Sequence, residues 1–199
     1  SGGKAYVTLQ ENNAIAVLDL ASRTFDGIYS AGFEDYSVTP IDIDKKDDAY
    51  APRTYGSLLG IRMPDGITAF QVDGKTYLVT ANEGDAREWG DEDLGTFYLS
   101  EDEQDFGEEG VTSPTGAITG ENSGLEGKVV FFKVEDFDGL DSGKDYLFGG
   151  RSFTLYEVTD TGIEEVFTSG DDFESLTAKY FPDYFNASND NAVLDDRSG

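Results

Sequence analysis

Residues 64–87 read PDGITAFQVDGKTYLVTANEGDAR, and this stretch decides how the rest of the chain is interpreted. Apolar residues alternate with polar ones over 66–72 and 75–81, which predicts two strands, and Gly84 predicts a sharp stop after the second. Polar side chains crowd the end of that second strand: Asn82, Glu83, Asp85 and Arg87. Because β-rich proteins commonly place functional sites at strand ends, we expect a site here.

The chain has the composition of a folded, strand-rich protein. Its 199 residues are 38% hydrophobic and include 14 Phe and 11 Tyr, enough to bury a sizeable core. The 24 glycines favour many short strands joined by turns over a helical bundle. No apolar run approaches the length that crosses a bilayer. Both ends look cut from a longer chain, so we expect further residues on either side.

The charge is strongly acidic, with 41 Asp plus Glu against 14 Lys plus Arg and a formal net charge of -27. This excludes a nucleic-acid surface, because phosphate binding requires a basic stripe. Excess carboxylate suits a solvated surface in saline surroundings, and it also supplies oxygen ligands for hard cations such as calcium. These two interpretations are compatible, and both stay open.

Cysteine and histidine are both absent from the sequence. Their absence excludes disulfides, thiolate chemistry and Ser-His-Asp catalysis by these residues. It equally excludes the ordinary zinc and copper sites.

The strand predictions extend along the chain. A meander is expected over 4–10, 14–20 and 24–29, with a hairpin turn at Asn12-Asn13, followed by a polar connection over 31–63. Further strands are expected at 128–134, 152–158 and 162–167. Residues 88–127 are predicted to be an acidic surface insertion with one short strand at 96–99. A helix capped by Asp171 or Asp172 should carry Phe173, Leu176 and Tyr180 on one face and end at Pro182.

The segment 4–13 is echoed by 75–85, with the two lysines 71 positions apart. In this alignment Glu11 corresponds to Glu83, and Asn13 to Asp85. Spaced repeats of a meander predict the blades of a β-propeller. A chance similarity between two hairpins is the alternative.

Three sets of motifs resemble one family. The segments YVTLQENNAIAVLD (6–19), PDGI (64–67) and YLVTANEGDAR (77–87) are similar to choice-of-anchor I proteins, which are secreted bacterial β-propellers related to mesenchyme-specific cell surface glycoproteins and to lactonase-type YVTN propellers. The resemblance implies an all-β chain in which 1–199 forms three to four blades of a single seven- or eight-bladed propeller. The insertion at 88–127 departs from the family pattern.

Calcium is the metal expected at the end of the 75–81 strand. Asn82, Glu83 and Asp85, with Asp65 one strand away, offer several of the six to eight oxygens that calcium takes. In the alternative, Asn82 and Asp85 cap the turn backbone while Glu83 pairs with Arg87. A second acidic run at 42–48 lacks the spacing of an EF-hand, and we expect it to be a solvated loop.

An enzyme is the alternative function. The resemblance implies a distant relation to propeller-type alkaline phosphatases, in which acidic residues hold calcium and iron and an arginine binds phosphate. Glu83 and Asp85 would then be metal ligands, and Arg87 the phosphate-binding residue. However, the net charge repels an anionic substrate, and the sequence shows no pair of nucleophile and base.

The favoured prediction is a non-catalytic, calcium-binding module with a structural or adhesive role. The family setting implies secretion, an extracellular position at the cell surface, and cell-surface or extracellular-matrix partners, with self-assembly as another option. An Asn186-Ala187-Ser188 triplet fits a glycosylation acceptor. Four aromatic residues lie at the end of the predicted helix and just after it: Tyr180, Phe181, Tyr184 and Phe185. A contact patch is one interpretation, and core packing under the helix is the one we favour.

Overall fold

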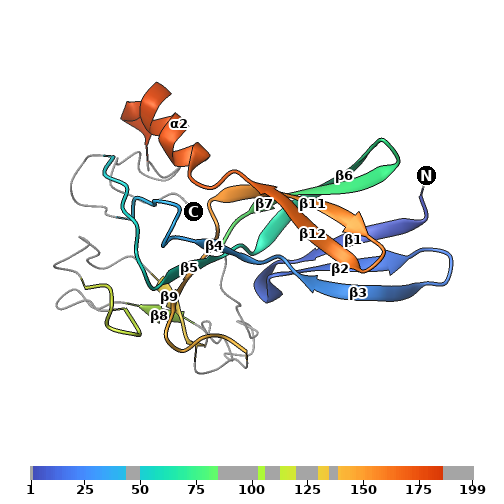
Figure 1. The fold of residues 1–199 in the computed structure, drawn as a ribbon, viewed down its shortest axis with the longest axis horizontal. Coiled ribbons are helices and arrows are strands. Elements are labelled where there is room, and N and C mark those ends of the chain that lie inside the picture. Colours follow the sequence, from blue (N-terminus) through green and yellow to red (C-terminus); the bar gives the residue numbers. More distant parts are fainter. Residues whose placement is uncertain are drawn as a thin grey trace, which may run out of the picture.

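The protein is mostly β, with three sheets and one short helix in the part that the structure describes (Figure 1). The structure is a computed structural model that describes residues 2–43, 50–84, 103–105, 113–119, 130–134 and 139–185. The predicted strand at 96–99 and the triplet at 186–188 lie outside these ranges. Among the described sheets, one has the four antiparallel strands expected for a propeller blade.

The first sheet is the predicted meander, in the order β1-β2-β3. Its strands are β1 (Lys4–Leu9), β2 (Ala14–Asp19) and β3 (Thr24–Ser30), all antiparallel. The turn between β1 and β2 is a short 3-10 segment, η1 (Gln10–Asn12), closed by Asn13 in the left-handed conformation with φ of 49°. Asparagine tolerates that conformation, which explains the residue at this position.

A four-stranded antiparallel sheet packs on the first sheet in the order β12-β11-β7-β6. Its strands are β6 (Pro64–Val72), β7 (Lys75–Asn82), β11 (Ser152–Thr159) and β12 (Gly162–Thr168). The predicted strands are confirmed to within two residues. Burial alternates along the two central strands, β7 and β11, as expected for strands with one face toward a core. The core between the two sheets contains Ile15, Leu78 and Tyr156, with Tyr6, Ile67, Val158 and Ile163 around them.

The third sheet has five strands in the order β4-β5-β10-β9-β8. These are β4 (Phe33–Asp35), β5 (Leu58–Ile61), β8 (Glu103–Asp105), β9 (Val130–Phe132) and β10 (Asp145–Phe148). The pair β5 and β10 is parallel. The prediction of a polar connection over 31–63 is wrong where β4 and β5 lie. Both are short, and β5 is buried on both faces, so neither shows alternation.

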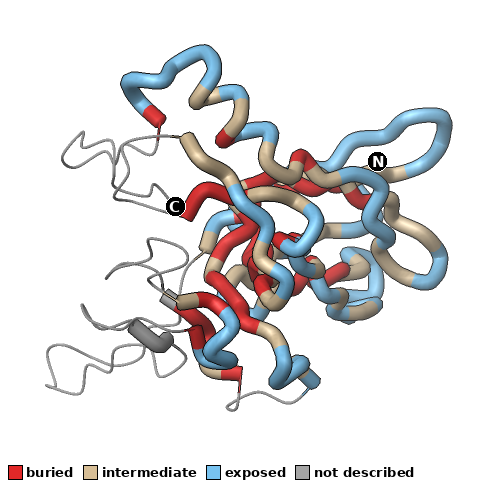
Figure 2. Tube along the Cα trace, turned by 60° about the vertical axis from the view of Figure 1, so that its left-hand side comes forward, coloured by how far each residue is buried: buried red, intermediate tan, exposed pale blue. Residues whose placement is uncertain are grey.

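Buried residues concentrate where the sheets meet, whereas the hairpin tips are exposed (Figure 2). A second core cluster lies on one side of the third sheet and includes Tyr36, Ile41, Leu58, Phe131 and Leu147. Two glycines allow the end of β7 to approach the end of β10. A Cβ on Gly84 would lie 2.3 Å from the backbone nitrogen of Gly149, and Gly149 itself has φ of 84°. The predicted stop at Gly84 is therefore also a close backbone contact.

The predicted helix is confirmed as α2 (Asp172–Tyr180), which starts directly after Asp171. Pro182 follows within η4 (Pro182–Tyr184). The face that turns inward differs from the expectation, because the buried residue of α2 is Glu174. Phe173 and Leu176 are about half exposed.

The aromatic residues after the helix pattern are mostly on the surface. Tyr180, Phe181 and Tyr184 are 61%, 62% and 71% exposed, so the favoured prediction of core packing is wrong for these three. Phe185 is buried and stacks edge-on against Tyr50 at 5.1 Å between ring centroids. The three rings are exposed because α2 turns the side that carries Glu174 toward the sheets, and not an apolar side.

Candidate functional site

The chain segments that follow β1 and β7 both bond to Met63. The backbone N–H of Met63 donates to Asn13 Oδ1 at 2.9 Å, and the Met63 carbonyl accepts from the Glu83 N–H at 3.2 Å. Met63 therefore connects the two strand ends. Despite their similar sequences, β1 and β7 occupy different positions in their sheets: β1 lies at an edge, and β7 lies between two other strands.

Asn82, a predicted calcium ligand, lies buried at the end of β7, where its side chain is held by three hydroxyl groups. Its Nδ2 donates to Ser152 Oγ at 2.9 Å and to Thr154 Oγ1 at 2.8 Å. Its Oδ1 accepts from Thr80 Oγ1 at 2.9 Å. These bonds join β7 to β11, so Asn82 contributes to the sheet structure.

The other predicted site residues are spread out. Asp65 is exposed at a bulge of β6, where its backbone carbonyl accepts from Thr8 Oγ1 at 2.9 Å. Glu83 is exposed just after β7, and Asp85 and Arg87 lie outside the described residues. Within the described ranges, His, Cys, Asp and Glu side chains form no group of three that would hold a metal ion. The calcium site remains a prediction.

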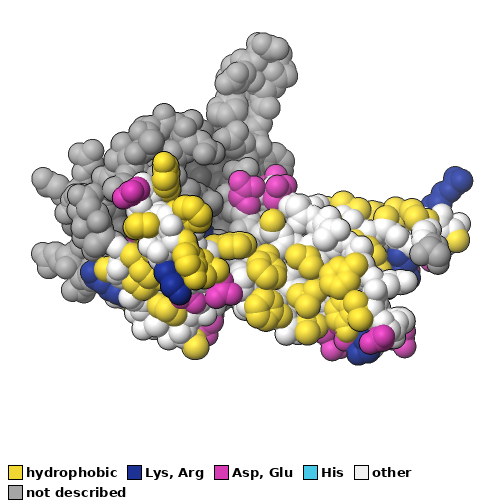
Figure 3. Space-filling view, turned by 90° about the horizontal axis from the view of Figure 1, so that it is seen from above, with side chains coloured by type: hydrophobic (Ala, Val, Ile, Leu, Met, Phe, Trp, Pro, Cys, Tyr) yellow, Lys and Arg dark blue, Asp and Glu magenta, His cyan; other side chains and the backbone are white. Residues whose placement is uncertain are grey.

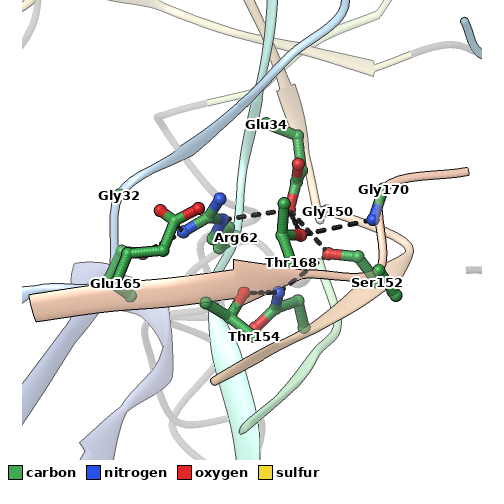
Figure 4. Close-up of polar contacts among 12 residues, drawn as sticks. Gly32, Glu34, Arg62, Gly150, Ser152, Thr154, Glu165, Thr168 and Gly170 are labelled. Carbon is green, nitrogen blue, oxygen red and sulfur yellow. Dashed lines mark hydrogen bonds and ion pairs between the residues drawn. The ribbon is translucent and has the colours of Figure 1, made fainter. Parts of the chain in front are cut away.

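A buried pair of opposite charges lies elsewhere, at the junction of the sheets (Figure 4). Glu34 on β4 and Arg62 directly after β5 are each 2% exposed. Arg62 Nε donates to Glu34 Oε1 at 3.0 Å. The same oxygen accepts from Ser152 Oγ at 2.8 Å and from Thr168 Oγ1 at 2.6 Å. This cluster, which we call the junction cluster, joins the third sheet to β11 and β12.

Arg62 keeps its positive charge despite burial. Burial lowers the pKa of Arg62, but the hydrogen bond to Glu165 and the charge of Glu34 outweigh it, so the pKa lies above its ordinary value. The Glu165 contact is 2.6 Å, and that side chain is half exposed. Arg62 Nη1 also donates to the Ala31 carbonyl, which accepts from the Tyr156 hydroxyl at 2.6 Å. The junction cluster therefore reaches the segment that follows β3.

The sequence does not predict the junction cluster, because its members are distant along the chain. One signal was available: Arg62 interrupts the apolar run 58–63, LLGIRM. A charged residue within a buried segment requires a buried partner. The partner, Glu34, lies 28 positions earlier and carries no such signal.

A cleft of about 350 Å³ lies between the ends of β7 and β11 and the underside of α2. Its floor carries a second buried pair, in which Arg151 Nη1 lies 2.5 Å from Glu174 Oε1. Arg151 also donates to the Asp42 carbonyl at 3.2 Å. Asp42, expected in a solvated loop, is 1% exposed, and its carboxylate accepts from the Ala51 N–H at 2.8 Å. The rest of the acidic run, from residue 44 onward, lies outside the described residues.

The comparisons with known proteins decide the family. A family model described as "Choice-of-anchor I domain" matches residues 1–199. The chain belongs to the choice-of-anchor I family. It is also similar to the mesenchyme-specific cell surface glycoprotein of Strongylocentrotus purpuratus, with 32% identity over 180 residues that cover 80% of this chain. The chain spans 23% of that protein's length. No solved structure matches significantly.

The family membership confirms the resemblance seen in the sequence motifs. The relative is named as a cell surface glycoprotein, so this choice-of-anchor I chain is related to a cell-surface protein. In the part of the chain that the structure describes, no helix is long and apolar enough to span a membrane.

Proposed function

We propose that this choice-of-anchor I chain is a non-catalytic module with a structural and adhesive role at the cell surface, stabilised by calcium. The observation that carries the proposal is how the polar residues at the strand ends are used. Asn82 donates to both Ser152 and Thr154, and Glu34 and Arg62 form the centre of the junction cluster. These groups hold sheets together, so they are not available to act on a substrate.

The outer face of the four-stranded sheet supports the structural role. Leu78 and Tyr156 are paired across the sheet and face the core between the two sheets. Because successive residues of a strand point to opposite faces, the residues directly before and after them face outward. The outer face is rich in apolar side chains: Phe70, Val72, Tyr77, Val79, Phe153, Leu155 and Phe167. Rings continue this surface onto α2, since Phe153 lies 5.6 Å from Phe167 and 5.9 Å from Phe173. Figure 3 shows hydrophobic side chains gathered over this sheet and α2.

We infer that a further β-sheet packs on this outer face, as the next blade of a propeller. The inner face of the same sheet already packs on the β1-β2-β3 sheet through the same kinds of side chains. In the Strongylocentrotus purpuratus relative, most of the polypeptide lies outside the part matched here, since the match spans 23% of its length. Exposed apolar patches of this kind mark contact surfaces.

The experiment compares adhesion with catalysis. Beads coated with the 199-residue chain are passed over cells that display the same protein and over cells that lack it, in calcium and in EDTA. Phosphoester turnover is measured in parallel with calcium and iron present. We expect retention on the displaying cells and no turnover above buffer. Metal-dependent turnover with no retention would overturn the proposal in favour of a phosphatase.

A further inference from the structure

The cleft under α2 has chemistry that the structural role does not explain. Aromatic side chains form one wall, with Phe173 from α2 and Tyr184 and Phe185 from the segment after it. Glu83 lies at the other side, just after β7. A volume of about 350 Å³ is within the range of pockets that hold small groups. The kind of group that fits depends on which lining atoms remain free to bind it.

Two of the neutral polar side chains that line the cleft, Asn82 and Ser152, are already engaged. Both N–H groups of the Asn82 amide donate to hydroxyls, and its oxygen accepts from Thr80. Ser152 Oγ accepts from Asn82 and donates to Glu34. A sugar or another polyol needs several free donors and acceptors, and these two residues do not supply them.

The positive charge in the floor is balanced. The Arg151 guanidinium lies against the Glu174 carboxylate at 2.5 Å and also donates to the Asp42 carbonyl. An anion that bound Arg151 would compete with this buried pair and leave Glu174 without its charge partner, which is costly. The cleft is therefore unfavourable for phosphate or carboxylate ligands.

Glu83 gives the cleft its excess negative charge. Its carboxylate is exposed and forms neither a hydrogen bond nor an ion pair with any described residue. Among the described residues that line the cleft, Arg151 and Glu174 carry opposite charges, so Glu83 leaves one net negative charge, on a chain of net charge -27. Such a field attracts cations, and the faces of aromatic rings bind them. On the same helix, Lys179 Nζ already lies 4.9 Å from the centre of the Tyr180 ring.

We propose that the cleft under α2 binds a lysine or arginine side chain from a basic segment of a partner polypeptide. The charged head pairs with Glu83, and the methylene stem packs on Phe173 and Tyr184, as long basic side chains do on apolar surfaces. This inference rests on the proposed adhesive role and names the chemistry of the partner.

The test measures binding of a fluorescein-labelled peptide of alternating glycine and lysine to the 199-residue chain by fluorescence anisotropy. Peptides with arginine, norleucine or glutamate in place of lysine, and free lysine amide, are compared. The titrations contain EDTA, because calcium at Glu83 would compete with the peptide. We expect the lysine and arginine peptides to bind, and the norleucine and glutamate peptides not to bind. Free lysine amide should bind more weakly than the peptides, and equal affinity would overturn the assignment to a polypeptide.

Two variants locate the site. Glu83→Gln removes the charge and Tyr184→Leu removes the ring, and each should weaken peptide binding about twofold to fivefold, as expected for exposed ion pairs and cation–π contacts. Glu164→Gln is the matched control, because it removes an exposed carboxylate on β12 by the same chemical change. Equal weakening by Glu83→Gln and Glu164→Gln, or no effect of Tyr184→Leu, would overturn the proposal.

Bead adhesion separates this inference from the proposed function. Loss of retention with Glu83→Gln beads supports the cleft as the contact. If wild-type and Glu83→Gln beads are retained equally, the cleft proposal fails and the adhesive role stands. If wild-type beads are not retained at all, the proposed function fails.

Discussion

Replacement of Arg62 by methionine tests whether the junction cluster holds the sheets together. Methionine keeps much of the volume of the arginine stem but removes the guanidinium. The Glu34 carboxylate, 2% exposed, then loses its only charge partner among the described residues. Ser152 and Thr168 still donate hydrogen bonds to the carboxylate, so it is left without its charge partner but not without hydrogen-bond donors.

The expected cost follows from this geometry. Breaking a buried ion pair by removing one partner costs about 3–5 kcal/mol, because a charge is left uncompensated. The two remaining hydroxyl donors favour the lower end, so we expect Arg62→Met to lower the free energy of unfolding by about 3 kcal/mol. Loss of the Glu165 contact adds little, since that side chain is half exposed. Typical domains are stable by about 5–15 kcal/mol, so the change is a large fraction of the total.

The assay is urea unfolding followed by far-UV circular dichroism, since guanidinium chloride would screen the charges under test. The double variant Glu34→Met with Arg62→Met removes both charges. Its loss of unfolding free energy should be smaller than the sum of the losses in the two single variants. We expect a loss of about 1–3 kcal/mol, because the hydroxyls of Ser152 and Thr168 lose their acceptor. Lys75→Met is the control, because Lys75 pairs with Glu157 on the surface and should change stability little. An Arg62→Met protein within about 1 kcal/mol of wild type would refute the reasoning.

Three further predictions concern single positions and the metal. Gly84→Ala should cost at least about 1–3 kcal/mol, because the new Cβ overlaps the backbone of Gly149, whereas Gly66→Ala, with 3.8 Å to its nearest neighbour, should be tolerated; equal urea midpoints would contradict this. Tyr156→Phe should cost about 1 kcal/mol below pH 10 through the lost bond to Ala31. Burial raises the pKa of Tyr156, so the wild type loses stability above the ordinary tyrosine pKa of about 10. The difference in unfolding free energy between the wild type and Tyr156→Phe should therefore shrink above this pH, and a difference that widens with pH would exclude this explanation. EDTA should lower the thermal midpoint of calcium-loaded protein, and an unchanged midpoint would argue against the calcium site.

The sequence predicted the strands of six to nine residues and, in the third sheet, β9 within the run expected at 128–134. The long strands were all expected, because each is a run of adequate length bounded by turn residues: β1, β2, β3, β6, β7, β11 and β12. Of these, β2, with the sequence AIAVLD, is marked by an apolar run and not by alternation. β10, with the sequence DYLF, is buried on both faces at its first three residues, so its pattern carries no period. β4 has three residues, two of them acidic.

The end of β7 was predicted from the sequence, and the metal-binding role of its residues stays a prediction. Asn82 and Glu83 do lie at a strand end beside a cleft, yet Asn82 serves the sheet structure, and the charged residues on the cleft floor come from elsewhere. Arg151 follows β10, and Glu174 lies on α2, 23 positions later. Such pairs depend on tertiary packing, which neither local pattern nor composition reveals. The inward direction of α2 was missed for the same reason.

The most direct test of this account is amide hydrogen exchange resolved by strand, because its central claim is that buried charges at one junction make the three sheets a single structural unit. The account predicts that the slowest amides of β2, β7 and β10 share one opening free energy, and that Arg62→Met lowers all three together. Amides of β10 that keep their protection while those of β7 lose theirs would show that the sheets open independently, and would contradict the claim.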